Sequence, residues 1–163
     1  MTCLTGRSIQ TYYTCGYSDF WGHKFLNPQQ ADVSLHTLHS VNDSGRGSLC
    51  VAEQDKDVPF PIQRVFYLHD LPEGIERARH AHRFQDEFLI CLGGKVEVTT
   101  IRGQNQRHFT MSRPDEGLYL PSMTWISIKV LSAMTTCLVL CSGLYNESDY
   151  IRNYAHFEVL QKN

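Results

Sequence analysis

The sequence predicts an all-β domain, a sandwich or barrel of short strands that ends in one short helix. About nine short segments are either apolar or alternate apolar with polar residues, and turn residues separate them at spacings of about 8–12 residues. The length agrees with one domain, because 163 residues with 42% hydrophobic and 20% charged side chains match an ordinary globular unit. We therefore expect a single domain over residues 31–163, preceded by an aromatic-rich extension over residues 1–30.

The expected strands begin at residue 33. They cover residues 33–41, 48–53, 64–69, 86–92, 95–101, 107–111, 117–120, 125–130 and 134–141. Residues 43–47 form the first turn, since glycine adopts positive φ and Asp and Ser bond to the local backbone. Residues 102–105 form a hairpin turn. The mostly apolar run at 134–141 is typical of a central, buried strand.

The end of the chain is predicted to be helical. Tyr150, Ile151, Tyr154 and Phe157 fall on one face of a helix that starts near residue 150. The polar residues 146–149 suit its N-terminus, where capping side chains and negative charge are favoured.

Composition excludes several classes of function. The net charge of −2 argues against a nucleic-acid binder and against an anionic-membrane binder. No apolar run reaches the roughly 18 residues of a membrane span, and the start of the chain lacks the apolar core of a signal peptide. We therefore expect a cytoplasmic protein, in which the six cysteines are buried hydrophobic residues and not disulfides or zinc ligands.

One polar cluster carries the chemistry. Gly74, His80, His82, Glu87 and Gly94 match the pattern G-x5-H-x-H-x4-E-x6-G, which is the first motif of the cupins. The match refines the predicted fold to a cupin-type double-stranded β-helix, or jelly roll. Residues two apart on a strand share a face, so both imidazoles are expected to point the same way. Glu87 is expected to approach them from the paired strand.

Two chemistries fit a His-x-His pair beside a carboxylate. One is a metal site of two histidines and a carboxylate. Metal-binding cupins draw a further histidine from a second motif, but here Met123 and Ile126 stand where its glycine and histidine would be. The other is metal-free acid–base catalysis, because histidine titrates near neutral pH and can both take and return a proton.

Arginines lie near the histidine pair in the sequence. They are Arg46, Arg64, Arg77, Arg79 and Arg83. A planar guanidinium pairs well with phosphate, so several of them near one pocket indicate a phosphorylated ligand.

Several short motifs of the sequence resemble those of the sugar-nucleotide 3,4-ketoisomerases, the WxcM-like cupin family, over about residues 35–160. The motifs are Arg46-Gly-Ser-Leu49, Val58-Pro-Phe60, Arg64-Val-Phe-Tyr67, Arg77-x-x-His-Ala-His82, Arg113-Pro-x-x-Gly-Leu-Tyr119 with Pro121 and Trp125, and Tyr145-Asn-Glu-Ser-Asp-Tyr-Ile-Arg-Asn-Tyr154. The resemblance implies an isomerase that converts a dTDP-4-keto-6-deoxyhexose into its 3-keto isomer, which feeds the synthesis of dideoxyamino sugars for O-antigen or antibiotic glycosides. It also implies a jelly-roll homodimer that exchanges N-terminal strands and needs neither a metal nor an organic cofactor.

The resemblance further implies roles for individual residues. His82 would remove the proton from C3, and His80 would move a proton between the two sugar oxygens. Arg46, Arg77 and Arg64 would bind the pyrophosphate and the sugar.

Four more residues are expected at the site. Tyr67 either hydrogen-bonds a sugar oxygen as part of the catalytic set or lies in the core. Glu87, Tyr119 and Trp125 are assigned to substrate binding.

Three departures from the family pattern stand out. The family often has glutamine at the position of Glu87, and a carboxylate there raises the pKa of the histidines or invites a metal. Ala78 and Arg79 replace a glycine and an aromatic residue. Ile126 and Ser127 stand where the family usually shows His-Glu.

Two other classes of function stay open. One is a metal-dependent cupin enzyme that uses His80, His82 and Glu87. The other is a non-catalytic module that binds nucleotide sugars, which the missing His-Glu pair after Trp125 motivates.

Overall fold

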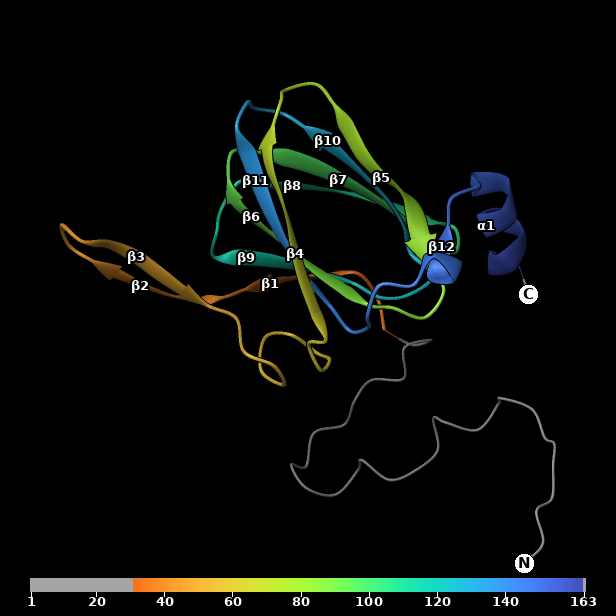
Figure 1. Ribbon diagram of the computed structural model, residues 1–163, viewed down its shortest axis with the longest axis horizontal. Coiled ribbons are helices and arrows are strands. Elements are labelled where there is room, and N and C mark those ends of the chain that lie inside the picture. Colours follow the sequence, from red (N-terminus) through yellow and green to blue (C-terminus); the bar gives the residue numbers. More distant parts are fainter. Residues whose placement is uncertain (1–30, 163) are drawn as a thin grey trace, which may run out of the picture.

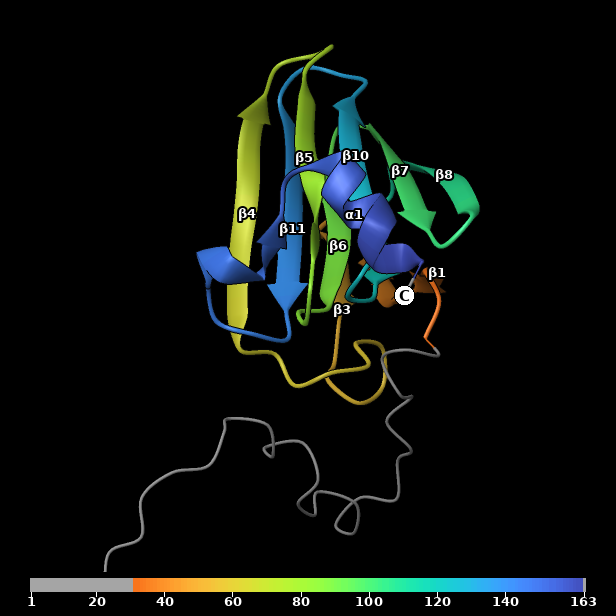
Figure 2. The same cartoon turned by 90° about the vertical axis from the view of Figure 1, so that its right-hand side faces the viewer.

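The computed structural model describes residues 31–162, which form two facing five-stranded antiparallel sheets (Figure 1, Figure 2). The first sheet has the order β1 (Ser34–Thr37), β9 (Glu116–Leu120), β6 (Glu87–Gly93), β11 (Thr135–Cys141) and β4 (Arg64–Leu71). The second has the order β12 (Tyr150–Ile151), β5 (Glu76–His82), β10 (Trp125–Val130), β7 (Val96–Arg102) and β8 (Asn105–Met111). The predicted all-β jelly roll is therefore confirmed.

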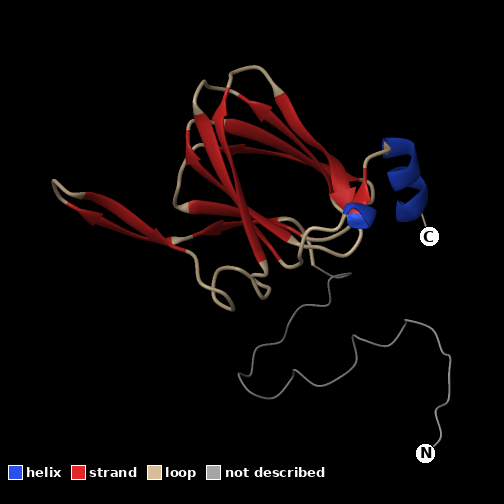
Figure 3. Cartoon of the chain, in the orientation of Figure 1, coloured by secondary structure: helices blue, strands red, loops and turns tan. Residues whose placement is uncertain are grey.

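Two smaller features flank the sandwich. β2 (His39–Asp43) and β3 (Gly47–Val51) pair into a hairpin that projects from one end. At the other end lie the short 3-10 helix η1 (Glu147–Asp149) and the helix α1 (Tyr154–Gln161), the helical part of an otherwise stranded described chain (Figure 3). The extension predicted over residues 1–30 lies outside the described residues.

The main core lies between the two sheets. Strands of both sheets contribute buried side chains, among them Leu89, Cys91, Val96, Val98, Leu118, Ile128, Val130, Cys137 and Val139. The expectation that Val96 and Val98 share a face is confirmed, because burial alternates along β7. β11 lies between β6 and β4, as expected for a central strand.

The strand predicted over residues 33–41 is in fact two strands. β1 pairs with β9 in the first sheet, whereas β2 pairs with β3 in the projecting hairpin. Between them the side chain of Leu38 is buried, and its N–H donates to the carbonyl of Asp115 at 2.8 Å. The local pattern does not show this break, since the two strands differ in their partners and not in their propensity.

The helix predicted from residue 150 starts later. Residues 150–151 form β12, which pairs with the end of β5. α1 begins only at Tyr154, where the side chain of Asn153 accepts a hydrogen bond from the N–H of His156 at 2.9 Å. Pairing with a distant strand outweighs the local helical spacing, because tertiary contacts override propensity.

The described cysteines are free thiols, and three of them, Cys91, Cys137 and Cys141, are buried as expected. Among residues 31–162, no helix has both the length and the apolar character that crossing a membrane requires.

Candidate active site

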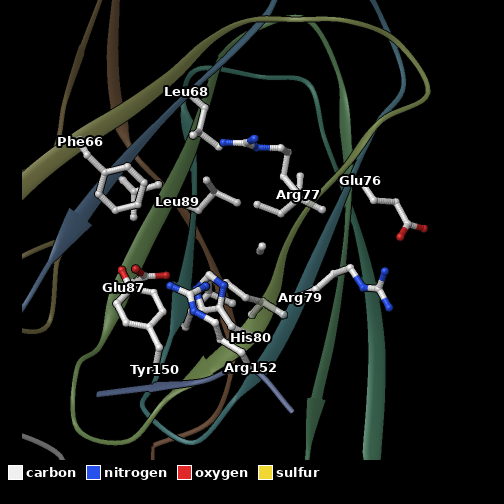
Figure 4. Close-up of a pocket in the computed structure, with 15 residues that line it drawn as sticks. Phe66, Leu68, Glu76, Arg77, Arg79, His80, Glu87, Leu89, Tyr150 and Arg152 are labelled. Carbon is white, nitrogen blue, oxygen red and sulfur yellow. The ribbon is translucent and has the colours of Figure 1, made fainter. Parts of the chain in front are cut away.

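A cavity of about 350 Å³ opens inside the sandwich between β4 and β5 (Figure 4). Its polar lining residues are Glu76, Arg77, Arg79, His80, Glu87, Tyr150 and Arg152. Its apolar lining residues are Phe66, Leu68, Ala78, Leu89, Leu120, Ile126, Ile128 and Val139. Three of the polar groups are guanidinium ions, and an apolar wall with a few charged groups is typical of a small-molecule site.

A β-bulge in β5 aims side chains at this cavity. The register of β10 against β5 slips by one residue there, which leaves Arg79 as the extra residue. Ala78 and Arg79 have positive φ values of 65° and 60°, a conformation that costs non-glycine residues about 1–2 kcal/mol each. The extra residue shifts the alternation of the strand by one position. As a result Arg77 and His80, on the two sides of the bulge, both line the cavity.

The two histidines of β5 are close neighbours. The ring centroids of His80 and His82 lie 5.0 Å apart, with the ring planes almost perpendicular. This confirms the expectation that the strand places both imidazoles on one side. His80 lines the cavity, whereas His82 lies behind it and is only 4% exposed.

Two carboxylates enclose His82. Its Nδ1 lies 2.8 Å from Oδ2 of Asp149, and its Nε2 lies 3.2 Å from Oε1 of Glu87. The contact with Asp149 has hydrogen-bond geometry, but Nε2 is buried without a hydrogen-bond partner. Nδ1 of His80 is also buried without a partner.

These surroundings shift the pKa values of the two histidines in opposite directions. Burial lowers the pKa of His80, and the neighbouring His82 lowers it further. Burial also opposes a charge on His82, but the carboxylates of Glu87 and Asp149 outweigh it and raise the pKa of His82 above 6.5. His80 is therefore a neutral imidazole near pH 7, and His82 is the stronger base of the pair.

Glu87 reaches the histidines from the opposite sheet. It begins β6, which pairs with β9 and β11, so the expectation that Glu87 stands on the strand paired with the histidine strand is wrong. The loop after β5 crosses between the sheets, and the carboxylate meets His82 across the interior. There Gln85 donates to Glu87 at 3.2 Å, and the thiol of Cys141 lies 3.9 Å from the same oxygen. Burial is the main cause that raises the pKa of Cys141, and the negative charge of Glu87 raises it further, to about 11, so this thiol is protonated.

The segment from η1 to β12 closes the site. The ring of Tyr150 lies 4.3 Å from that of His82 and 5.0 Å from that of His80, measured between centroids. The guanidinium of Arg152 lies 4.4 Å above the Tyr150 ring and donates to both carboxylate oxygens of Glu147 at 2.9 and 3.0 Å. In Figure 4 Tyr150 and Arg152 stand beside His80 at one end of the cavity.

The structure brings some of the predicted site residues together. His80, Arg77 and Glu87 line the cavity, and His82 lies directly behind them. Arg64 is not among the residues that line the cavity. It begins β4 and donates a hydrogen bond to the side-chain oxygen of Gln85 at 3.2 Å.

Two predicted site residues lie elsewhere on this chain. Tyr67 is 65% exposed on the outer face of β4, because its neighbour Phe66 takes the inward position on that strand. It is therefore not the core residue that was the alternative expectation. Arg46 lies at the tip of the projecting hairpin and forms an exposed ion pair with Asp43 at 3.3 Å.

Two more predicted site residues have structural contacts outside the cavity lining. The hydroxyl of Tyr119 donates to Asp86 at 2.9 Å, and burial raises the pKa of this phenol. Trp125 packs against α1, with its ring 5.5 Å from that of Phe157. Neither residue lines the cavity.

Three residues of the site were missed from the sequence. All three belong to the Asp-Tyr-Ile-Arg motif: they are Asp149, Tyr150 and Arg152. This motif carried part of the family resemblance, but its spacing predicted the start of a helix. The alternation of this motif is that of a strand: Ile151 is buried in the core, and Tyr150 and Arg152 face the cavity.

His80, His82 and Glu87 also offer a donor set for a metal ion. One ligand atom each of His80, His82 and Glu87 lies within 4.8 Å of the others. Two imidazoles and a carboxylate suit a divalent transition metal. The buried Nε2 of His82 without a hydrogen-bond partner fits such a role.

Fold and site together define a cupin-type protein whose polar groups are a histidine pair, carboxylates and arginines. Residues 31–162 match the family model described as WxcM-like, C-terminal, so the chain belongs to that family.

Several similar proteins of known activity are sugar 3,4-ketoisomerases. A TDP-4-oxo-6-deoxy-alpha-D-glucose-3,4-oxoisomerase from Aneurinibacillus thermoaerophilus is 36% identical over 113 residues, which are 69% of this chain and 81% of that protein. A solved 3,4-ketoisomerase from Helicobacter canadensis is 32% identical with a TM-score of 0.77, over 81% of this chain and 98% of that one.

Two further solved structures agree. The sugar 3,4-ketoisomerase QdtA from Thermoanaerobacterium thermosaccharolyticum, in complex with TDP, is 32% identical with a TM-score of 0.76, over 80% of this chain and 94% of that one. The TDP-quinovose 3,4-ketoisomerase WlaRB from Campylobacter jejuni is 35% identical with a TM-score of 0.74, over 78% of this chain and 98% of that one. The predicted family and the predicted isomerase activity are confirmed.

Proposed function

We propose that this isomerase acts on a dTDP-4-keto-6-deoxyhexose and moves its carbonyl group from C4 to C3, a step that prepares the sugar for amination. The observation that carries the proposal is the histidine pair, in which a neutral His80 on the cavity wall stands next to a more basic His82. The names of the relatives, and the TDP bound to one of them, support the choice of substrate. They also favour an enzyme over a non-catalytic binding module.

The cavity suits the sugar part of this substrate. Its volume of about 350 Å³ lies at the small end of the range of about 300–1,000 Å³ for ligand sites. We therefore place the hexose inside and the nucleoside diphosphate at the mouth. Leu68, Leu89 and Ile128 would face the methyl group of the 6-deoxy sugar, and Arg77 and Arg152 would pair with the diphosphate.

The proposed reaction consists of proton transfers. The C4 ketone acidifies the hydrogen on C3, and His82 removes this proton, which leaves an enediolate with its charge on O4. His80 takes the proton of O3 on its cavity-facing ring nitrogen and passes it from that nitrogen to O4, so it is neutral again afterwards. The charge now on O3 collapses to the C3 carbonyl, and the imidazolium of His82 returns a proton to C4.

The surrounding carboxylates support these steps. Glu87 and Asp149 stabilise the imidazolium that forms when His82 takes the proton. A well-placed general acid or base contributes about 10²–10⁴-fold to the rate.

The homodimer and the cytoplasmic location belong to the same proposal. The hairpin of β2 and β3 exposes Val41 and Leu49, at 47% and 62%, and an isolated two-stranded hairpin is marginally stable in water. A second copy of the chain would cover it, which supports the expected exchange of N-terminal strands and would bring Arg46 to a partner.

The test is to incubate the protein with dTDP-4-keto-6-deoxyglucose in D₂O and to follow the sugar protons by NMR. We expect a 3-keto sugar that carries deuterium at C4, and its coupling pattern gives the configuration at C4. His82→Asn is expected to abolish conversion while the protein still binds dTDP. Wild-type protein that neither converts the sugar nor exchanges the C3 hydrogen would overturn the proposal.

A metal-dependent enzyme is the second candidate, on the strength of the His80, His82 and Glu87 donor set. It predicts a stoichiometric divalent metal after purification and a loss of turnover with a chelator, which the metal restores. Full turnover by metal-free protein would exclude it.

A further inference from the structure

We propose that Gln85 is a positioning residue that fixes the carboxylate of Glu87, and that Arg64 in turn fixes the amide of Gln85. The proposal rests on the isomerase function above and concerns the contacts that hold Glu87 in place. Gln85 lies in the loop between β5 and β6, is only 6% exposed and does not belong to the cavity lining. It can therefore act on the substrate only through a residue that does line the cavity.

The contacts of the Glu87 carboxylate gather on one of its two oxygens. Oε1 accepts a hydrogen bond from the amide nitrogen of Gln85 at 3.2 Å. The same oxygen lies 3.2 Å from Nε2 of His82 and 3.9 Å from the thiol of Cys141. None of these contacts uses Oε2, and Glu87 lines the cavity. Oε2 is therefore the oxygen that is left for a hydroxyl group of the sugar.

The direction of these hydrogen bonds follows from the chemistry of the groups. A guanidinium only donates and a carboxylate only accepts, whereas a side-chain amide does both. Nη2 of Arg64 donates to the amide oxygen of Gln85 at 3.2 Å, so the amide nitrogen is the atom turned toward Glu87. A flipped amide would face the carboxylate with its oxygen and the guanidinium with its NH₂ group, and both contacts would be repulsive. Arg64 therefore sets the orientation in which Gln85 donates.

The rest of the structure holds both the guanidinium and the loop. The guanidinium of Arg64 lies 5.4 Å from the ring centroid of Phe66 and 5.6 Å from that of Tyr145, distances at which an aromatic face attracts a cation. On the loop after β5, the backbone N–H of Asp86 donates to the hydroxyl of Ser142 at 2.8 Å, and its carbonyl accepts from the N–H of the same serine at 3.0 Å. The amide between them is thus oriented before a substrate arrives.

The main test is Gln85→Leu, because leucine has a similar volume and no hydrogen-bond donor. A hydrogen bond to a charged group is worth about 10–100-fold, so we expect kcat to fall by about this factor. The Kd for dTDP is expected to change little, because the nucleotide lies at the mouth of the cavity. Gln104→Leu, the same change at an exposed residue on the turn between β7 and β8, is the matched control and is expected to keep the wild-type kcat.

A double-mutant cycle separates positioning from a merely structural role. Glu87→Gln introduces the residue that the family often has at this position, so a measurable kcat is expected. In that background Gln85→Leu is expected to lower kcat by less than about threefold, because the negative charge that Gln85 holds is gone. Each kcat is measured at the pH optimum of its variant. An equal loss in both backgrounds would overturn the inference, since Gln85 would then not act through Glu87.

Two further measurements apply even if Gln85→Leu does not fold. Arg64→Met removes the donor that orients the amide, so kcat is expected to fall with little change in the Kd for dTDP. A raised Kd with unchanged kcat would instead make Arg64 a ligand of the nucleotide and overturn its assigned role. In ¹⁵N-labelled protein, the side-chain NH₂ signals of Gln85 are expected to shift in Glu87→Gln and to stay in place in Gln104→Leu. Unmoved signals in Glu87→Gln would overturn the inference, whereas shifted signals in a protein without turnover would support it and overturn the proposed function alone.

Discussion

The docking of α1 is expected to support the active site, and replacing Phe157 by alanine tests this. Phe157 is 1% exposed, and its ring lies 5.5 Å from that of Trp125 and 6.0 Å from that of Tyr154. Removing a buried phenylalanine costs about 3–5 kcal/mol. We expect the low end, about 3 kcal/mol, because α1 lies at the edge of the domain, where neighbours can relax.

The expected change in Tm follows from this free energy. For a domain of this size each kcal/mol shifts Tm by about 2–4 °C, so Phe157→Ala is expected to lower it by about 6–12 °C. Circular dichroism during heating measures the shift. Glu158→Ala, an exposed change on the same helix, is the control and is expected to stay within about 0.5 kcal/mol of the wild type.

The same substitution is expected to lower kcat. Ile151 belongs to the same buried cluster as Phe157, so loosening the helix loosens β12, which pairs with the histidine strand. The isomerase assay at a temperature where the variant is folded measures this effect. A lower Tm with unchanged kcat would show that the helix stabilises the fold without supporting the site, and an unchanged Tm would refute the packing itself.

Three further predictions concern the site. Ala78→Gly relieves the positive φ of 65° but makes the unfolded chain more flexible, so we expect a gain in stability of about 0–1 kcal/mol, measured by urea unfolding. Tyr150 lines the cavity, so we expect its hydroxyl to bond the sugar; Tyr150→Phe keeps the ring packed on both histidines, so Tm is expected to hold while kcat falls about tenfold or more, and an unchanged kcat would contradict this role of the hydroxyl. His82 has to be neutral to accept a proton, so kcat is expected to rise as pH increases through its raised pKa. Glu87→Gln removes a negative charge, lowers that pKa and moves the rise to lower pH; a pH–rate profile that does not move would contradict the assigned role of Glu87.

The sequence was sufficient to predict the fold and the side-by-side placement of the two histidines. Short alternating segments such as β7 expose their period directly, and a two-residue spacing on a strand fixes the relative direction of His80 and His82. Both inferences are local, because they depend on the geometry of one strand.

The remaining contacts of the site depend on pairings that no local pattern records. The bond between His82 and Asp149 requires β12 to pair with β5, and the spacing of residues 150–157 favoured a helix instead. The β5 bulge was hidden for a different reason. Its positive φ values fall on Ala78 and Arg79, where a glycine would have signalled them.

Tyr67 shows how one position on a strand decides a prediction. The same strand carries Phe66 into the cavity, and the alternation then turns Tyr67 to the outer face. Knowing that a segment is a strand does not tell which of its two sets of side chains faces inward.

Because of the bulge in β5, the side chains that face the cavity depend on whether the number of residues between Arg77 and His80 is odd or even. In a regular strand, residues an odd number apart point to opposite faces, so Arg77 and His80 share the cavity only because one extra residue lies between them. Deleting Arg79 would restore a regular strand and turn the guanidinium of Arg77 away from the substrate, with the fold and the histidines otherwise intact. Insertions and deletions in this stretch would therefore be tolerated in pairs, whereas single ones would exchange the groups that face the cavity. An odd or an even number of residues in this part of β5 therefore decides which side chains face the cavity.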